Sequence, residues 1–173
     1  MTTDLRAALR DAAGTLNTLA RRSESSDRHP LVDPDEFYHA AKQYRAIADA
    51  PPGWHLHPQL ADDTHPLAHW PLCDVRLMDD ANHPWLILVP RVEGATELTD
   101  LASAQQAALT AEIDRACRAL QAAVRPHKLN VAALGNVVPQ LHVHVIARFR
   151  DDIAWPRPVW GTAAAQPYSP EAL

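Results

Sequence analysis

Apolar and polar residues alternate along residues 139–148, PQLHVHVIAR. Successive side chains of a β-strand point to opposite faces, so this alternation predicts a strand over 140–148 with one aliphatic and one polar face. The polar face would carry Gln140, His142 and His144. Because such groups are costly to bury without partners, we expect the polar row to form the floor of a ligand site.

The remaining patterns predict an α+β domain behind a helical extension. Helical spacing of leucine and alanine predicts a helix over 3–21, and Asp33-Pro34 opens a second helix that continues to about residue 48, after a polar linker. Ser103 is expected to cap a long amphipathic helix that Pro126 stops. The predicted strands are 54–57, 72–78, 85–89, 128–134 and 140–148. Strands, one long helix and further strands indicate a mostly antiparallel sheet with a helix layer.

These predicted elements divide the chain into three parts. Residues 1–50 form the N-terminal helical extension, 51–161 the catalytic domain, and 162–173 a loose tail rich in small residues and proline. The predicted helices of the extension carry no recognisable chemistry.

Charge and cysteine content exclude several classes of partner. A formal net charge of -5 gives no general attraction to nucleic acid or to an anionic membrane. No apolar run approaches the length of a membrane span, and the N-terminus lacks the apolar centre of a signal peptide. Cys73 and Cys117 are isolated in apolar surroundings, which indicates free buried thiols and a cytoplasmic protein.

The pair His142 and His144 can be interpreted in three ways. A neutral imidazole is a nucleophile near pH 7, and a second one about 6–7 Å along the strand can meet charge that develops on a phosphorus atom. Two histidines at this spacing also recur in zinc sites, although zinc needs a third ligand. They could finally be partly exposed histidines with satisfied hydrogen bonds. The spacing alone leaves all three open.

The turn before this strand adds a possible anion site. Gly135-Asn136 precedes the polar row, and backbone N–H groups beside a glycine can hold a phosphate without lysine. An ordinary turn between strands is the alternative. Asn130, on the neighbouring predicted strand, could reach the same anion through its amide.

The run GNVVPQLHVHVIAR resembles the signature of the histidine triad (HIT) family of nucleotide hydrolases and transferases, His-φ-His-φ-His-φ-φ after a Gly-Gln pair and a Ser or Thr. HPWLILVPR (83–91) and DVRLMDDAN (74–82) are similar to two other family segments, in the same order. The resemblance covers roughly residues 54–150. It implies an antiparallel sheet with helices, a homodimer, and no cofactor or tightly bound metal.

The resemblance also implies roles for single residues. His142 matches the nucleophile that forms a nucleotidyl–histidine intermediate, and His144 the histidine that contacts the phosphate and assists the leaving group. Asn130 and Asn136, beside Gly135, match contacts to the α-phosphate. Contacts to the ribose hydroxyls match Asp79 or Asp80.

Two positions depart from the family pattern. Gln140 replaces the first histidine of the triad and can orient by hydrogen bonds but cannot titrate. Val137 stands where a phosphate-binding hydroxyl is usual. We therefore expect a HIT-type enzyme acting on the α-phosphate of a nucleoside monophosphate conjugate, of the dinucleoside polyphosphate or phosphoramidate type. The first alternative is a nucleotide-binding or sensing module without turnover, and the less favoured one is a zinc-binding protein.

Other polar and aromatic residues have less specific interpretations. His55 and His57 are expected on a first strand whose polar face meets solvent or a second subunit, with a ligand role as the alternative. Arg148 could help bind an anionic substrate, although an arginine at the end of a strand is expected to be solvated. The aromatic residues after the polar strand could cover the site, contact a partner copy or pack in the core; they are Trp155 and Trp160. The histidines in proline-containing loops, expected at the surface, are His65, His69 and His83.

Overall fold

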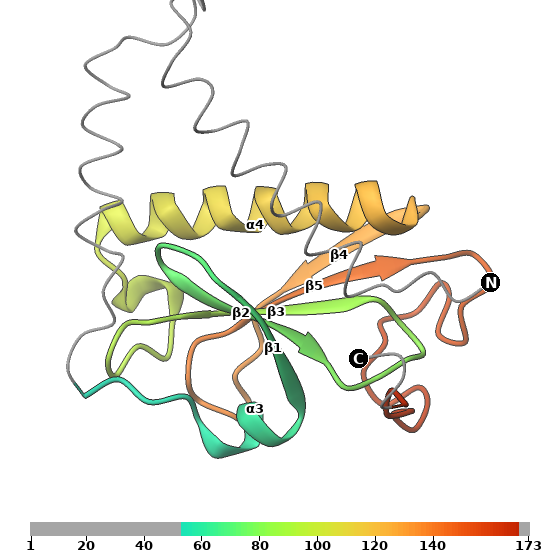
Figure 1. Ribbon diagram of the computed structural model, residues 1–173, viewed down its shortest axis with the longest axis horizontal. Coiled ribbons are helices and arrows are strands. Elements are labelled where there is room, and N and C mark those ends of the chain that lie inside the picture. Colours follow the sequence, from blue (N-terminus) through green and yellow to red (C-terminus); the bar gives the residue numbers. More distant parts are fainter. Residues whose placement is uncertain (1–52, 170–173) are drawn as a thin grey trace, which may run out of the picture.

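The computed structural model describes residues 53–169, and these residues form one sheet with a helix layer (Figure 1). The helices predicted over 3–21 and 33–48, and the linker between them, lie outside the described residues. The arrangement of the extension therefore stays a prediction.

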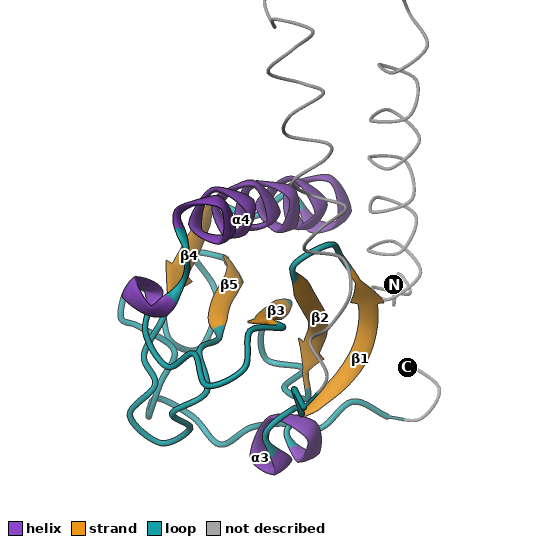
Figure 2. Ribbon diagram, turned by 90° about the vertical axis from the view of Figure 1, so that its left-hand side faces the viewer, coloured by secondary structure: helices purple, strands orange, loops and turns teal. Residues whose placement is uncertain are grey.

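The sheet has five strands, and every neighbouring pair is antiparallel. The strands are β1 (Thr64–His69), β2 (Cys73–Met78), β3 (Trp85–Pro90), β4 (Lys128–Ala132) and β5 (Val143–Arg148). They lie side by side in the order β1-β2-β3-β5-β4. The helical elements are α3 (Pro58–Asp62), the 3₁₀ turn η1 (Leu98–Asp100) and α4 (Ser103–Val124). Helix α4 crosses one face of the sheet and α3 lies on the opposite side (Figure 2), so the predicted α+β architecture is confirmed.

The first part of the sheet differs from the prediction in two ways. Residues 54–57 are not a strand, and the first strand is β1, which begins at Thr64. Pro66 lies within β1, and a proline argues against a strand in the sequence because it has no N–H to donate to a ladder. Because β1 is an edge strand, with a register shift between Pro66 and Ala68, the missing N–H is tolerated there.

The long helix has the predicted extent and differs at its first residue. Ser103 is the first helical residue, and the N-cap position is Ala102, whose backbone N–H donates to Gln105 Oε1. The helix ends at Val124, where Arg125 adopts a left-handed conformation with φ 49°. Pro126 follows, as expected of a residue that cannot continue a helix.

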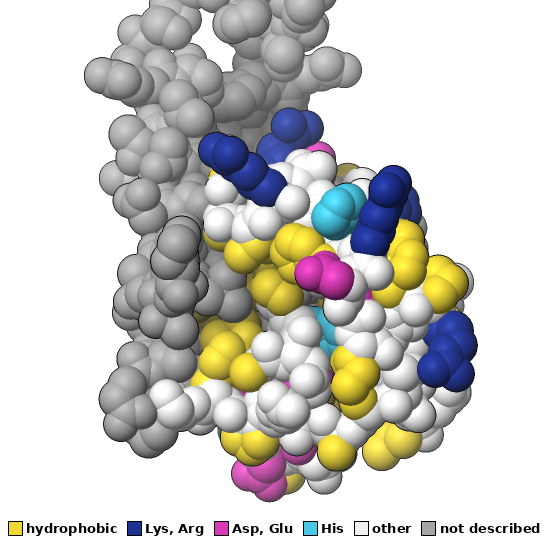
Figure 3. Space-filling view, turned by 90° about the vertical axis from the view of Figure 1, so that its right-hand side faces the viewer, with side chains coloured by type: hydrophobic (Ala, Val, Ile, Leu, Met, Phe, Trp, Pro, Cys, Tyr) yellow, Lys and Arg dark blue, Asp and Glu magenta, His cyan; other side chains and the backbone are white. Residues whose placement is uncertain are grey.

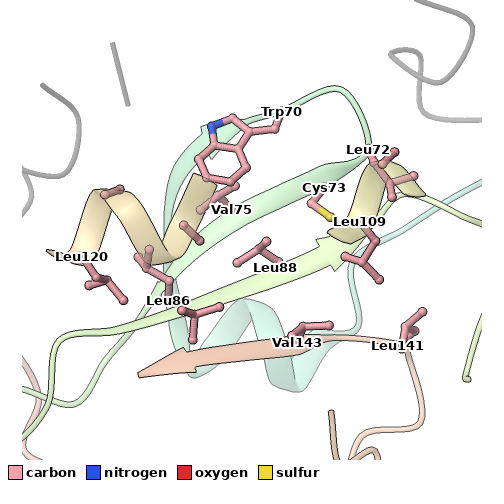
Figure 4. Close-up of a cluster of buried hydrophobic side chains, with 14 of the residues drawn as sticks. Trp70, Leu72, Cys73, Val75, Leu86, Leu88, Leu109, Leu120, Leu141 and Val143 are labelled. Atoms are coloured by element: carbon pink, nitrogen blue, oxygen red, sulfur yellow. The ribbon is translucent and has the colours of Figure 1, made fainter. Parts of the chain in front are cut away.

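The main core fills the space between α4 and the sheet (Figure 4). Leu109 and Leu120 of α4 pack against Leu86 and Leu88 of β3 and against Val143 at the start of β5. The alternate residues of β5, Val145 and Ala147, belong to the same cluster. The side chains of β5 between them must therefore point away from α4.

A second apolar cluster lies on the face away from α4. Ile146 of β5 packs there with Trp85 and Ile87 of β3 and with Leu60 of α3. Val159, from the segment after β5, closes the cluster. The polar residues of β5 thus emerge on a face that α3 and the segment after β5 partly cover.

A buried carboxylate ties α4 to the start of β2. Glu112 accepts hydrogen bonds from the backbone N–H groups of Leu72 (2.8 Å) and Cys73 (2.9 Å), and it is 2% exposed. Burial raises its pKa, while the two backbone donors oppose that rise. Cys73 is buried and free, as predicted, and Cys117 is free and half-buried.

The outer surface of this part of the chain is mixed in character. Lys and Arg side chains form separate clumps on the face shown in Figure 3, with apolar and acidic groups between them. None of the helices in the described range 53–169 has the length and apolar character needed to cross a bilayer.

Candidate functional site

His142 stands just before β5, on the side of the sheet away from α4 and next to the second apolar cluster. The residue is 6% exposed, and its Nδ1 lies 2.7 Å from the backbone carbonyl oxygen of Gln140. A carbonyl only accepts, so Nδ1 must carry the proton, and Nε2 of the neutral ring holds the free lone pair. The local backbone thus prepares Nε2 of His142 as a nucleophile or base.

His144 points to the same face and has the opposite tautomer. Its Nδ1 accepts a hydrogen bond from the indole Nε1–H of Trp85 at 3.1 Å, so the neutral ring carries its proton on Nε2. Burial, and secondarily the neighbouring His142, lower the pKa of His144 from 6.5 to about 4. The ring is therefore neutral at physiological pH.

The two imidazoles and two tryptophans form one aromatic cluster. The rings of His142 and His144 meet edge to face with centroids 4.8 Å apart. Trp160 packs edge-on against His144 at 5.3 Å and against Trp85 at 5.7 Å. Because Trp160 is still 38% exposed, it borders the pair and does not seal it in a core.

Gln140 uses its side chain to hold a distant segment of backbone. Its Oε1 accepts from the N–H of His57 at 2.9 Å, and its Nε2 donates to the carbonyl of His55 at 2.9 Å. The two bonds resemble one rung of a β-ladder made by a side chain. They hold residues 55–57 beside Gln140 although these residues are not a strand.

The loop between β4 and β5 presents its polar groups to solvent. Gly135 has φ +74°, a conformation that favours glycine, and an added Cβ would meet nothing closer than 3.9 Å. Its backbone, and not a close approach, therefore requires glycine. Asn136 is exposed, and Val137 is 89% exposed.

Asn130 belongs to a buried polar network on the same face of the sheet. Its Oδ1 accepts from Arg148 Nη1 at 2.8 Å, and Arg148 also donates to both carboxylate oxygens of Asp152, at 2.7 and 3.0 Å. Arg148 is 2% exposed, so the prediction of a solvated arginine is wrong. Burial alone would raise the pKa of Asp152, but hydrogen bonds from Arg148 and from backbone N–H groups lower it to about 2.

This network anchors the segment that carries the two tryptophans. Asp152 also accepts from the N–H groups of Phe149 and Ala154, which fixes the turn after β5. Trp155 lies 5.9 Å from the Arg148 guanidinium, in cation–π contact. The segment after β5 thus covers part of the site face, one of the interpretations that the sequence left open.

The two candidate ribose contacts, Asp79 and Asp80, lie in the turn between β2 and β3. Asp79 Oδ1 accepts from the N–H of Tyr168 at 2.9 Å, and Asp80 Oδ1 accepts from the N–H of Gln166 at 3.1 Å. Residues 164–168 of the expected loose tail are thereby bound to the domain. A ribose contact by either acid stays a prediction, and it would compete with these bonds.

Of the histidines expected at the surface, His69 is exposed as predicted, His65 is half-buried and His83 is buried. His83 is 3% exposed, with Nδ1 4.0 Å from Asp152, and burial lowers its pKa. His65 and His69 lie on β1 and face Asp79 and Asp74. Within residues 53–169, no group of three or more His, Cys, Asp or Glu side chains is arranged to hold a metal ion.

The structure therefore brings together His142, His144 and the backbone of Gln140. It adds Trp160, which the sequence offered as a possible cover, and two residues that the sequence did not assign to the site, Trp85 and Asp152. Trp85 could not be assigned from its neighbours in the chain because its partner lies 59 residues away.

Comparisons with known proteins agree with this arrangement. The model of the HIT domain family matches residues 60–151. A histidine triad protein, blr8122, from Bradyrhizobium japonicum is 52% identical, with 68% of this chain and 88% of that chain covered and a TM-score of 0.67. A histidine triad protein (SMc02904) from Sinorhizobium meliloti 1021 is 44% identical, with 69% of this chain and 88% of that chain covered and a TM-score of 0.68. A histidine triad protein from Marinobacter aquaeolei VT8 is 48% identical, with 69% of this chain and 87% of that chain covered and a TM-score of 0.68. No curated protein matches the chain.

Proposed function

Since the chain belongs to the HIT domain family, we propose that it is a nucleotide hydrolase or transferase that works through a nucleotidyl intermediate on His142. The substrate is a nucleoside monophosphate conjugate, and the reacting centre is its α-phosphorus. The observation that carries this proposal is the hydrogen bond from His142 Nδ1 to the Gln140 carbonyl. It leaves the Nε2 lone pair free in the neutral ring and stabilises the positive charge that appears on the ring during attack.

The reaction has two steps. His142 Nε2 attacks phosphorus in line, the bond from phosphorus to the leaving group breaks, and the leaving group takes the electron pair. Water then attacks the same phosphorus, the P–N bond breaks, the lone pair returns to Nε2, and one proton of the water is released to solvent. A second acceptor in place of water would make the protein a transferase.

Several groups of the site can stabilise the charge on the phosphoryl oxygens. His144 offers its Nε2–H at a ring separation of 4.8 Å from His142. The Oδ1 of Asn130 is held by Arg148, so its Nδ2 amino group is the donor available to an anion. Asn136 and the backbone at Gly135 are on the exposed loop before the site and supply further donors.

A non-catalytic nucleotide sensor is the second candidate, and the Gln140 side chain favours it. That side chain is committed to the backbone of residues 55 and 57 and cannot carry a proton. Val137, at 89% exposure, offers no hydroxyl to a phosphate. Binding of a nucleotide without any product or covalent adduct would support this candidate.

Turnover assays of two histidine variants test the enzyme proposal. We expect His142→Ala to keep its fold, measured by circular dichroism, and to lose hydrolysis of dinucleoside polyphosphates and nucleoside phosphoramidates. His127→Ala, at an exposed histidine after α4, is the matched control and should retain activity. Full activity in folded His142→Ala would exclude the nucleophile.

A further inference from the structure

The buried contact between Trp85 and His144 restricts the chemistry that His144 can perform. The indole Nε1 lies 3.1 Å from His144 Nδ1, and the two residues are 5% and 7% exposed. An indole N–H is a donor only, so Nδ1 must stay an acceptor for this bond to exist. The single proton of the neutral ring is then on Nε2.

Protonation of His144 would bring a second N–H against the indole N–H. The described titratable side chain in ring contact with His144 is His142, at 4.8 Å, and a charge there opposes a second charge. Trp160 covers a further edge of the ring at 5.3 Å. Burial first, and His142 second, lower the pKa of His144 to about 4, in agreement with this geometry.

We propose that Trp85 is a positioning residue that holds His144 as a neutral Nε2–H donor, so that the leaving group of the substrate departs without a proton from the enzyme. The inference rests on the proposed function, because it assigns the leaving-group chemistry of that same site. His144 then stabilises charge on the phosphoryl group and does not act as a general acid.

The proton balance of the site leads to this conclusion. To give up its Nε2 proton, the His144 ring would have to gain one at Nδ1, and Trp85 cannot release its own. The Nδ1–H of His142 is bound to a carbonyl, and the Gln140 amide does not titrate. The electron pair of the broken bond therefore leaves on an unprotonated group.

This requirement selects a class of substrate. Polyphosphate and carboxylate groups are weak bases that depart as anions, whereas amines and alcohols need a proton as they leave. The structure thus favours nucleoside polyphosphates and acyl nucleotides over phosphoramidates.

The tautomer is testable without any substrate by ¹⁵N imidazole NMR of the full-length protein, with the His144 signals assigned through a His144→Gln variant. We expect an unprotonated Nδ1 and a protonated Nε2 from about pH 5.5 to about pH 8. In Trp85→Phe, which keeps a ring but loses the donor, part of the population should protonate Nδ1. Trp70→Phe, a buried tryptophan on the other face of the sheet, is the control and should keep the wild-type signals. A protonated Nδ1 in the wild-type protein would overturn the proposal.

The leaving-group dependence is measured with aryl esters of adenosine and guanosine 5′-monophosphate. We expect kcat/KM of the wild type to fall steeply as the leaving group becomes more basic. In Trp85→Phe the dependence should flatten, with the poorest leaving group gaining about 10²-fold relative to the best, the lower end of the typical range of general acid catalysis. A flat dependence in the wild type would refute the proposal, and so would an unchanged tautomer and slope in folded Trp85→Phe.

The two measurements separate the inference from the function on which it rests. A wild-type protein with the expected tautomer and no turnover of any ester would contradict the proposed enzyme but keep the role of Trp85. Should Trp85→Phe fail to fold, the wild-type tautomer and the wild-type slope still decide the question.

Discussion

The side chain of Gln140 is expected to act as a structural clip, and a series of substitutions can measure it. Its amide accepts from the His57 N–H and donates to the His55 carbonyl, each at 2.9 Å. A typical hydrogen bond contributes about 0.5–1.5 kcal/mol net, so Gln140→Met should weaken the attachment of residues 55–57 by about 2 kcal/mol. Since about 1.4 kcal/mol is a factor of ten, the His57 amide should exchange its hydrogen more than tenfold faster in this variant.

Gln140→Glu separates the two bonds. The carboxylate can still accept from the His57 N–H, but an oxygen now opposes the His55 carbonyl, and only the protonated acid can donate to it. The pKa of this glutamate should therefore lie above its usual value in the folded state. A raised pKa means that the stabilisation is present at low pH and lost as pH rises through the folded pKa. We expect the His57 amide to be more protected near pH 4 than near pH 7 after correction for the intrinsic exchange rate.

Hydrogen exchange measured by NMR on the full chain provides the assay. Gln59→Met is the matched control, because the side-chain amide of Gln59 donates to the Asp63 carboxylate at the C-cap of helix α3 and not to residues 55–57. The control should leave exchange of the His57 amide unchanged. Equal protection of that amide in wild type, Gln140→Met and Gln140→Glu at both pH values would show that the Gln140 side chain does not hold residues 55–57.

Three further predictions concern buried polar groups. The pKa of His144 is about 4 in the folded protein and 6.5 in an unfolded chain, so unfolded chains bind the proton first as pH falls. Urea titrations should therefore show that the free energy of unfolding falls by about 3 kcal/mol between pH 6.5 and pH 4. Folded His144→Gln should lack this fall. Arg148→Met leaves the buried Asp152 carboxylate without its arginine partner and should lower the free energy of unfolding by about 3–5 kcal/mol. The double variant Arg148→Met/Asp152→Leu should regain part of that stability. Equal stabilities of the single and double variants in calorimetry would contradict the ion pair. Glu112→Gln keeps one acceptor for two backbone donors and should cost about 1–3 kcal/mol, while the exposed change Gln121→Ala on the same helix should cost little.

The alternation of apolar and polar residues predicted the face of the sheet on which His142 and His144 lie, although the strand begins at Val143 and not, as predicted, at residue 140. A period of two fixes the face of each side chain once one face is buried, and Val143 and Val145 are in the core under α4. The continuous apolar run of β3 and the helical spacing of α4 are likewise local signals. Each of these predictions depends only on neighbours in the chain.

The features that were missed depend on contacts between distant residues. The burial of His83 follows from its approach to Asp152, which folds back after β5. Residues 54–57 have a strand-like pattern, yet their backbone partner is the side chain of Gln140, 83 and 85 residues away. No periodicity of the local sequence encodes such a partner.

The acids Asp79 and Asp80 illustrate a further limit. A motif can match a pair of carboxylates to a ribose contact, but it cannot reveal that backbone N–H groups of Gln166 and Tyr168 occupy their oxygens. Whether a nucleotide displaces this tail segment depends on a balance of hydrogen bonds that only a binding experiment measures.

The central claim, that His142 becomes nucleotidylated, is tested most directly by trapping the intermediate. The full-length protein is mixed with a dinucleoside polyphosphate, quenched under denaturing and mildly alkaline conditions that preserve the P–N bond, and mapped by peptide mass spectrometry. We expect a nucleoside monophosphate adduct on His142, absent from His142→Ala and present in His127→Ala. An adduct on another residue, or product formation by His142→Ala, would contradict it.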